Sequence, residues 1–300
     1  MDMTQNKCCR RGANLRRRRR RRRKILRSII FSCSIIAVAV FVAVGSSMIR
    51  SGDGRTNRYY VEAGNNTYDN AVIENSKISE KNKIQNNQSM LDDIMNSTQY
   101  PKQLKDLALK NEEALEFVYD YPAEHVKEHT IDLTEEAFMD SVPLFVQWDK
   151  RWGYEKYSGN FFAASGCGPT TLSMVVVYLT HNREASPIAV AKYSKEAGYS
   201  VDGSGSSWTL ISEGCRHYGV KAKTVALDES RMKAELDAGH PIVINVGPGD
   251  FTDTGHFMVI TGYDDEGFSI NDPNSIEKSG KRWLFRNISS QIRAVWSMYV

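Results

Sequence analysis

A helix is predicted to begin within Ser165-Gly-Cys-Gly-Pro-Thr170, and the organisation of the chain is clearest from this point outward. Pro169 suits the first turn of a helix, because its φ is already helical and a helix start leaves its first N–H groups unbonded. The apolar residues that follow extend the predicted helix over 169–181. Cys167 thus stands at a helix N-terminus, where backbone N–H groups and the helix dipole favour the thiolate, the nucleophilic form of cysteine.

A thiolate nucleophile requires a partner that exchanges a proton with it. Of the six histidines, His256 stands at the start of a predicted buried strand over 257–261. The chain then turns at 264–267, so a hairpin would bring Asp272 roughly across from His256. An acid there would orient the imidazole and stabilise its protonated form, although Asn271 could serve instead. We therefore expect a catalytic cysteine, histidine and aspartate.

Helical patterns precede strand patterns in the C-terminal half of the chain. This order is typical of an α+β domain with an antiparallel sheet, for which we take the boundaries 134–300. Trp208, Ile211 and Cys215 are spaced as a buried helical stripe, so Cys215 is expected to be a core residue. Helices are predicted over 169–181, 187–197 and 207–218, and strands over 241–246, 257–261 and 268–272.

Three stretches of this domain resemble the cysteine peptidase family thirty-nine: residues 142–149, 165–170, and 256–263 continuing to Asp272-Pro273. That family is papain-like, and it includes peptidases that cleave leader peptides after a double glycine. The resemblance covers about 134–300 and implies a papain-like fold acting on a peptide or protein substrate. It also implies a role for each site residue. Cys167 would be the nucleophile, His256 the general base and acid, Asp272 the orienting residue, and Gln147 the second oxyanion donor.

Two features differ from the leader-cleaving members of that family. Gln147 lies 20 residues before Cys167, whereas those members keep a glutamine only a few residues upstream. The sequence also contains one apolar span and no Gly-rich ATP-binding loop. Coupled leader cleavage and export within this chain is therefore not expected.

The first 50 residues predict a membrane anchor. Arg16–Arg23 is an unbroken basic run, and Ile29–Ile49 provides 21 residues without a charge. At ~1.5 Å per residue this segment covers the ~30 Å apolar core of a bilayer. The positive-inside rule then keeps residues 1–28 in the cytoplasm and places the catalytic domain outside the cell. A cleaved signal peptide, with a site near Ala43-Val44-Gly45, is the alternative.

Two segments lie between the predicted anchor and the catalytic domain. Residues 50–96 are rich in Asn, Ser, Lys and Glu with little apolar periodicity, which is typical of a disordered stalk. Residues 97–133 differ, because Pro101 opens a pattern of two short helices that ends at Pro122. We expect a helical extension over this second segment.

The charge is divided between the two ends of the chain. Residues 1–50 carry a net charge of +13 and residues 51–300 a net charge of −10. Since the basic residues are confined to the tail, a nucleic-acid partner is not expected. The acidity of the rest favours basic or neutral peptides as substrates. The chemistry expected of a cysteine nucleophile requires no metal or organic cofactor.

Other functions remain open. The same three residues could serve an amidase, an acyl transferase or a peptidoglycan hydrolase, or the domain could be an inactive peptide-binding module. The pattern His125-Val-Lys-Glu-His129 could hold zinc in a metallopeptidase. However, Pro122 leaves little room for the helix that such a site needs, and no third ligand is evident.

Overall fold

The computed structural model describes residues 67–300, with side chains from residue 81 onward. The predicted tail 1–28, the predicted span 29–49 and the start of the predicted stalk lie outside the described residues. Within the part that is described, no helix combines the length and the hydrophobicity needed to cross a membrane. Residues 69–300 form one compact unit.

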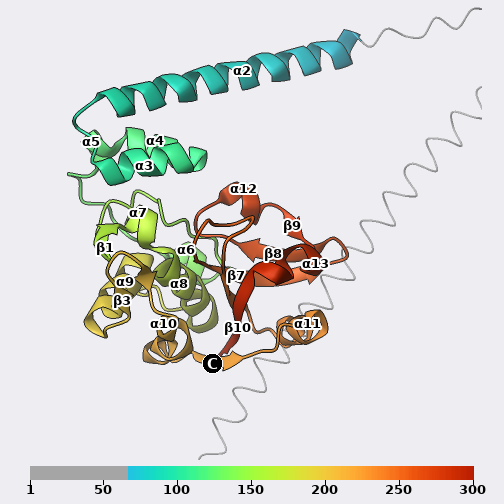
Figure 1. The fold of residues 1–300 in the computed structure, drawn as a ribbon. Coiled ribbons are helices and arrows are strands. Elements are labelled where there is room, and N and C mark those ends of the chain that lie inside the picture. The colour runs from blue at the N-terminus through green and yellow to red at the C-terminus, as the bar shows by residue number, and fades with distance from the viewer. Residues whose placement is uncertain (1–66) are drawn as a thin grey trace, which may run out of the picture. The chain divides into compact units, whose positions relative to one another are not determined.

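The central helix of the unit is α8, Cys167–Thr180, which begins two residues earlier than predicted. Ten of its fourteen residues are buried, and their side chains are apolar or small. The helix ends at His181, which has the left-handed conformation. The next helix, α9 (Pro187–Glu196), begins at Ser186, whose side chain accepts a hydrogen bond from the Ala189 N–H. Figure 1 shows these helices grouped on one side of the strands.

Six antiparallel strands form the main sheet, in the order β5-β10-β6-β7-β8-β9. The predicted α+β architecture with an antiparallel sheet is therefore confirmed. The sequence patterns predicted three of these strands and did not predict the other three. The strands are β5 (Lys221–Thr224), β6 (Ile242–Val246), β7 (His256–Asp264), β8 (Gly267–Asn271), β9 (Arg282–Trp283) and β10 (Ile292–Tyr299).

Both faces of the sheet are buried, and alternate residues serve the two faces. Along β6, Val243 packs into the core shared with α8, whereas Ile242 and Ile244 pack into a second core on the opposite face. That second core receives Met232 and Leu236 from helix α11 (Glu229–Asp237). Burial on both sides holds the register of the central strands, because a slip of one residue would exchange the two faces.

Short elements connect these layers. The predicted helix over 207–218 is wrong as a single helix, since the structure has α10 (Thr209–Ser212) and then a 3-10 helix, η2 (Gly214–Tyr218). Tight packing of Gly214 against Tyr199 and Leu210 accompanies this break. The other short elements are α6 (Thr134–Ala137), β1 (Lys156–Tyr157), β2 (Asn160–Phe161), α7 (Phe162–Ser165), β3 (Ser200–Val201), β4 (Gly205–Ser206), α12 (Ile276–Ser279), α13 (Phe285–Ile288) and η3 (Ser289–Gln291).

Helix α2 (Thr67–Asn96) occupies much of the segment predicted to be a disordered stalk. Its C-terminal turns carry Met90, Leu91 and Ile94, which pack into a third core with the extension that follows. The spacing of these three residues is helical, but it spans too few turns to stand out in a polar segment. Figure 1 shows α2 beside α3 and α4.

The extension is helical. It comprises α3 (Lys102–Lys110), η1 (Glu112–Ala114), α4 (Leu115–Tyr119) and α5 (Tyr121–Glu124). Pro122, predicted to end the helices, lies instead in the first turn of α5, where proline is tolerated. The core of the extension continues into the predicted catalytic domain through Phe161 and Ala163.

Two side chains of the extension are bonded to the segment that follows β8. The amide of Asn111 donates to the backbone carbonyl of Asn274 at 2.9 Å. The carboxylate of Glu113 accepts from the Ser275 hydroxyl, from the Ile276 N–H at 2.7 Å and from the Glu277 N–H at 3.1 Å. Glu113 therefore satisfies the first N–H groups of α12, which the helix itself leaves without partners.

We predict that Glu113→Gln lowers the free energy of unfolding by about 1–2 kcal/mol, because hydrogen bonds to charged groups contribute roughly 1.5–3 kcal/mol each. Amide hydrogen exchange at Ile276 and Glu277 should also become faster. Chemical denaturation and exchange measured by mass spectrometry check both effects. Glu116→Gln, an exposed position on the neighbouring helix α4, is the matched control. Equal stability and exchange in the two variants would contradict this role for Glu113.

Candidate active site

Cys167 is the first residue of α8, with a glycine on each side. A Cβ atom on Gly166 would lie 2.6 Å from the Phe162 carbonyl oxygen, and one on Gly168 would lie 2.5 Å from the Ser206 hydroxyl oxygen. Neither position has room for a side chain. The Gly-Cys-Gly motif therefore allows the helix start to approach its neighbours closely, with Cys167 half-buried between them.

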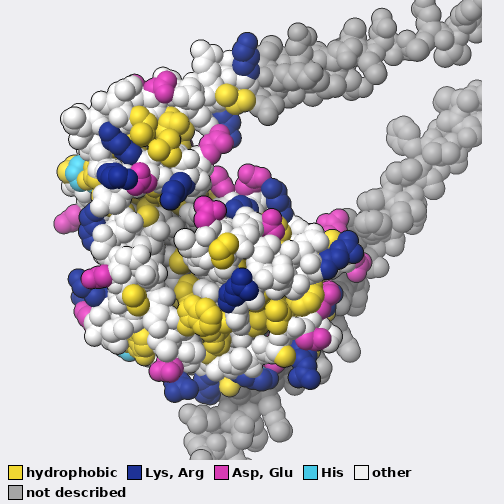
Figure 2. Space-filling view, in the orientation of Figure 1, with side chains coloured by type: hydrophobic (Ala, Val, Ile, Leu, Met, Phe, Trp, Pro, Cys, Tyr) yellow, Lys and Arg dark blue, Asp and Glu magenta, His cyan; other side chains and the backbone are white. Residues whose placement is uncertain are grey.

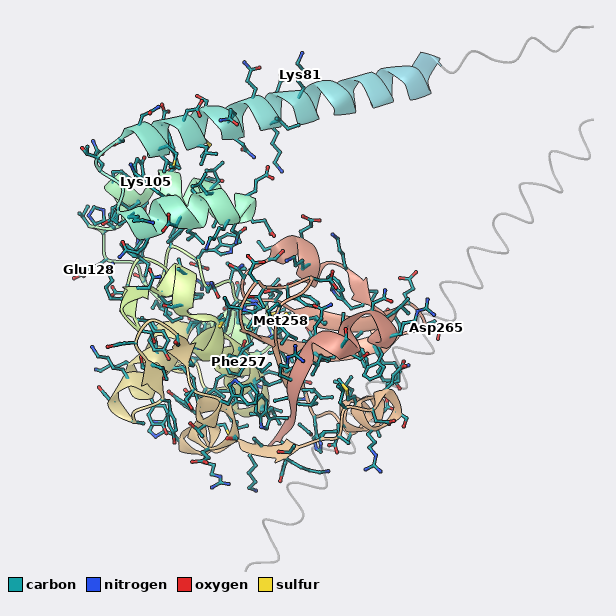
Figure 3. The ribbon with its side chains drawn as sticks, viewed as in Figure 1. Lys81, Lys105, Glu128, Phe257, Met258 and Asp265 are labelled. Carbon is teal, nitrogen blue, oxygen red and sulfur yellow. The ribbon has the colours of Figure 1, made fainter. Side chains whose placement is uncertain are left out.

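His256 is the first residue of β7 and is buried. Its Nε2 atom lies 2.7 Å from the Oδ1 atom of Asp272, which is completely buried. A bond from the Thr171 hydroxyl to the Phe257 carbonyl, 3.0 Å long, joins α8 to the residue next to His256. The helix that carries Cys167 is thereby held against the strand that carries His256. Figure 3 shows Phe257 and Met258 near the middle of the C-terminal part of the ribbon; both belong to strand β7.

The register of the hairpin explains how Asp272 reaches His256. Asn271 pairs with Val259, so continuation of the register brings Asp272 level with Met258, two residues along from His256. Asp272 was predicted to lie roughly across from His256, and in the structure it lies two residues away from that position. Diagonal neighbours on one face of an antiparallel pair remain within reach of long side chains.

The segment after β8 holds the carboxylate of Asp272 in place. Oδ1 also accepts a bond from the Asn274 N–H at 2.8 Å, and the Asp272 N–H donates to the Ser279 hydroxyl at 2.9 Å. Asn274 is bonded in turn to Asn111 and to the indole of Trp148. The extension thus reaches the site through one intermediate residue. Asn271, the alternative orienting residue, instead donates to the carbonyls of residues 142 and 143.

His256 is the side chain that acts on the thiol of Cys167, through hydrogen bonding and charge. Because Nε2 faces Asp272, Nδ1 is the ring nitrogen left for the sulfur. Burial opposes ionisation of the thiol, but the hydrogen bond and charge of His256, with the N–H groups of Phe257 and Gly168, outweigh it and lower the pKa of Cys167. Burial likewise opposes protonation of His256, yet Asp272 and Cys167 raise its pKa to about 10. These opposite shifts favour a thiolate and an imidazolium together.

Cys215 shows the contrasting behaviour. It is fully buried in the core, and burial raises the pKa of its thiol to about 11. A thiol in this setting is protonated at neutral pH and unreactive. The prediction that Cys215 is a core residue is confirmed. Trp208, predicted to share its buried stripe, is instead 47% exposed and lines the cleft at Cys167.

Gln147 is buried close to the other site residues, but its amide is turned toward the protein. Its Nε2 donates to the Ala163 carbonyl at 2.7 Å and lies 3.4 Å from the Asn274 Oδ1. Its Oε1 atom is buried, with no partner among the described residues. The Gln147 N–H donates to the Pro273 carbonyl at 2.7 Å, which ties this segment to the residue after Asp272. Neither of the hydrogen bonds of the Gln147 amide goes to Cys167.

An open cleft of about 630 Å³ exposes Cys167. Small and hydroxyl-bearing residues make up much of its wall, and the rings of Trp208 and Phe257 add apolar surface. A second groove, of about 500 Å³, contains Gln147 and residues of α3. The two share Asn160, Ala164 and Thr254, so an extended chain could pass from one to the other. The sequence patterns did not predict these wall residues, which come from distant segments.

The pattern His125-Val-Lys-Glu-His129 does not form a metal site in the structure. His125 Nδ1 lies 2.6 Å from the Tyr121 carbonyl oxygen, and the nearest contacts of His129 are with Glu124. Figure 3 shows Glu128 at the edge of the ribbon, pointing outward. Over residues 67–300, no group of three or more His, Cys, Asp or Glu side chains is placed to hold a metal ion.

Figure 2 shows Lys and Arg side chains interspersed with Asp and Glu over the visible face of the described residues. A continuous basic surface, which nucleic-acid binding requires, is not present on this face. Nucleic-acid binding therefore gains no support from this view.

Comparisons with known proteins identify the family of the C-terminal part of the chain. The model of the Peptidase_C39 like family matches residues 139–300. Among solved structures, the peptidase domain of Streptococcus ComA, a bi-functional ABC transporter involved in a quorum-sensing pathway, is 18% identical with a TM-score of 0.38. The match covers 53% of this chain and 96% of that one.

A C39-like peptidase from Bacillus anthracis is 17% identical with a TM-score of 0.33, over 57% of this chain and 98% of that one. A search of curated proteins finds no match. The family match alone covers more than half of the sequence and contains Cys167, His256 and Asp272. The chain therefore belongs to the Peptidase_C39 like family, and residues 139–300 form its family domain, in which helices pack against an antiparallel sheet.

Proposed function

We propose that this protein is a cysteine peptidase that hydrolyses peptide bonds with Cys167, His256 and Asp272 as its catalytic residues. The observation that carries the proposal is the buried His256–Asp272 pair, whose histidine acts on the thiol of Cys167. Family membership supports the reaction class. The position of Cys167 on an open cleft gives a substrate access to the sulfur.

The reaction begins from the thiolate and imidazolium pair. The sulfur of Cys167 attacks the carbonyl carbon, a C–S bond forms, and the carbonyl electrons move to the oxygen. As the tetrahedral intermediate collapses, the C–N bond breaks and His256 gives its proton to the departing amine. Water then attacks the thioester while His256 accepts a proton, and cleavage of the C–S bond releases the acid and restores the thiolate.

The oxyanion of each tetrahedral intermediate needs hydrogen-bond donors. We assign one of them to the Cys167 backbone N–H at the helix start. Gln147 is the second donor implied by family resemblance. In the free structure one Nε2 hydrogen is bonded to the Ala163 carbonyl at 2.7 Å and the other faces the Asn274 Oδ1 at 3.4 Å, so substrate binding would exchange one of these bonds for one to the oxyanion.

We propose that the apolar segment 29–49 anchors the chain in a membrane, with the basic residues 1–28 in the cytoplasm and the peptidase domain outside the cell. The support for this arrangement is the sequence itself: a long basic run directly before 21 uncharged residues. In this arrangement the cleft meets extracellular peptides, and Cys167 remains active only while it is not oxidised.

We predict that iodoacetamide labels Cys167 much faster than Cys215 in the folded protein, because only Cys167 combines access with a lowered thiol pKa. Mass spectrometry of tryptic peptides measures both rates. Cys167→Ala should also abolish peptide turnover, by at least about 10³-fold, since the nucleophile is lost. Cys215→Ala is the control and should retain activity. Equal labelling of the two cysteines, or peptide turnover by Cys167→Ala, would contradict the proposal.

The rate should depend on pH through both partners of the ion pair. Below the lowered pKa of Cys167 the thiolate is protonated, and above about 10 the His256 imidazolium loses its proton. Activity should therefore form a plateau between these limits, whereas iodoacetamide labelling, which needs only the thiolate, should rise through the acid limit and show no alkaline loss. Because Asp272 raises the pKa of His256, Asp272→Asn should move the alkaline limit to lower pH and reduce turnover by on the order of 10²- to 10⁴-fold.

Asp265→Asn is the matched control for this change. Asp265 is exposed at the turn of the β7–β8 hairpin, far from the site in Figure 3. Its pH profile should follow that of the wild type. An Asp272→Asn profile with an unmoved alkaline limit would show that Asp272 does not act on His256.

A further inference from the structure

We infer that Arg293 binds a carboxylate of the substrate, within about three residues of the bond that is cleaved. This inference rests on the proposed peptidase function, and it names a substrate class: peptides with an acidic side chain or a free C-terminal carboxylate near the cleavage point. Four observations support this inference. They are the β-bulge at Arg293, the space that its guanidinium group fills, the charge of the cleft, and the distance between Arg293 and His256.

Arg293 occupies an irregular position in β10. The register of β10 against β6 shifts between Ile292 and Ala294, which leaves Arg293 as the extra residue of a β-bulge. A bulge turns the side chain of its extra residue away from the regular alternation, and bulges are frequent beside active sites. Ile292 before it is buried and Ala294 after it is partly buried, whereas Arg293 itself is exposed.

The space taken by the guanidinium group exists because residue 247 is a glycine. A Cβ atom on Gly247 would lie 2.8 Å from the Nε atom of Arg293 and 3.2 Å from its Nη2 atom. The guanidinium therefore lies directly against the backbone at the end of β6. This position is also part of the cleft wall, since Gly247 and Arg293 both line the cavity that exposes Cys167.

Arg293 is the only Lys, Arg, Asp or Glu among the described residues that line this cleft. The structure gives its guanidinium no carboxylate partner among the described residues. Asp250, on the loop after Gly247, accepts a 2.6 Å bond from the Gln291 Nε2 atom instead. A planar guanidinium with unused donors matches the geometry of a carboxylate, which it can bind through two parallel hydrogen bonds.

The order of the strands fixes the distance between Arg293 and His256. Ile292 pairs with Val246, and Val246 pairs with His256. Ile292, the residue before Arg293, therefore lies two strands across the sheet from His256. Neighbouring strands are about 4.8 Å apart, which places the two backbones about 10 Å apart. An extended peptide covers that distance in about three residues, at roughly 3.3 Å each.

This preference is the reverse of the one expected from net charge. Residues 51–300 carry a net charge of −10, which favours basic or neutral peptides. Net charge, however, acts at long range and is screened over about 8 Å at physiological ionic strength. Inside the cleft the nearest fixed charge governs selection, and the cleft carries a positive one.

The test uses matched fluorogenic peptides that differ only by Glu or Gln at each position within three residues of the cleavage point. A second pair differs only by a free or an amidated C-terminus, so the two sources of a carboxylate are separated. The wild type should cleave one acidic member with a kcat/KM at least about 10-fold higher than its neutral partner. Arg293→Gln should lower kcat/KM for the acidic peptide and so abolish that ratio.

Arg293→Glu should reverse the preference toward a Lys peptide. Arg286→Gln, an exposed arginine of α13 that lines neither groove at the site, is the control and should keep the wild-type ratio. The inference is overturned if the wild type shows no preference at any position, or if the preference persists in Arg293→Gln.

Binding to Cys167→Ala separates this inference from the proposed function. Fluorescence anisotropy measures the Kd of each peptide for Cys167→Ala with and without Arg293→Gln. If the wild type cleaves nothing but Cys167→Ala prefers the acidic peptide through Arg293, the inference stands and the peptidase proposal fails. If peptides are cleaved but bind with no dependence on Arg293, only the inference fails. Absence of both cleavage and binding would overturn the two together.

Discussion

The hydrogen bond between His256 and Asp272 is the interaction on which the site depends. Both side chains are almost completely removed from water, and a charge in such a place is unfavourable unless a partner compensates it. Asp272 compensates the imidazolium, and the imidazolium in turn compensates the thiolate. Without the carboxylate, burial would leave the imidazole neutral and Cys167 a thiol. Several features of the fold serve to keep this one contact in place.

The bond joins the start of β7 to the residue after β8. In the register of the sheet, His256 and Asp272 are offset by two residues. Asp272 is held at its position by the segment from Asn274 to Ser279, whose own contacts come largely from outside the hairpin. Asn111 and Glu113, both outside the 139–300 family match, supply several of them. The helical extension is therefore joined to the site through hydrogen bonds. The folded unit that holds the candidate site is larger than the part matched by the family model.

The features that could be predicted from sequence are local ones. The helix start at Cys167 follows from Pro169 and the apolar residues after it, and the β7–β8 hairpin follows from two apolar runs around a polar turn. The features that could not be predicted depend on contacts between distant segments. Strand β10 pairs with β5 and β6, which lie 46 or more residues earlier, and its mixed sequence lacks a clear alternation. The orientation of the Gln147 amide toward Ala163 is likewise a property of the packed structure.

Some predictions concern parts that the structure does not describe. The basic tail and the apolar segment 29–49 remain predictions from the sequence, as does the extracellular position of the domain. Helix α2 shows how a polar segment can be misjudged, because only its C-terminal turns have the apolar contacts that a packed helix needs. Net charge likewise did not indicate the positive charge of the cleft at Arg293, because it sums over surfaces that a substrate does not contact.

The most direct test of this account is the ionisation state of Cys167 in the resting protein. The ultraviolet absorbance of a thiolate, measured against pH as the difference between wild type and Cys167→Ala, reports that state without any substrate. We predict that the thiolate persists to a pH below the usual thiol pKa of about 8.5. A thiolate that appears only near or above that value would contradict the account, because His256 and Asp272 would then not be acting on Cys167.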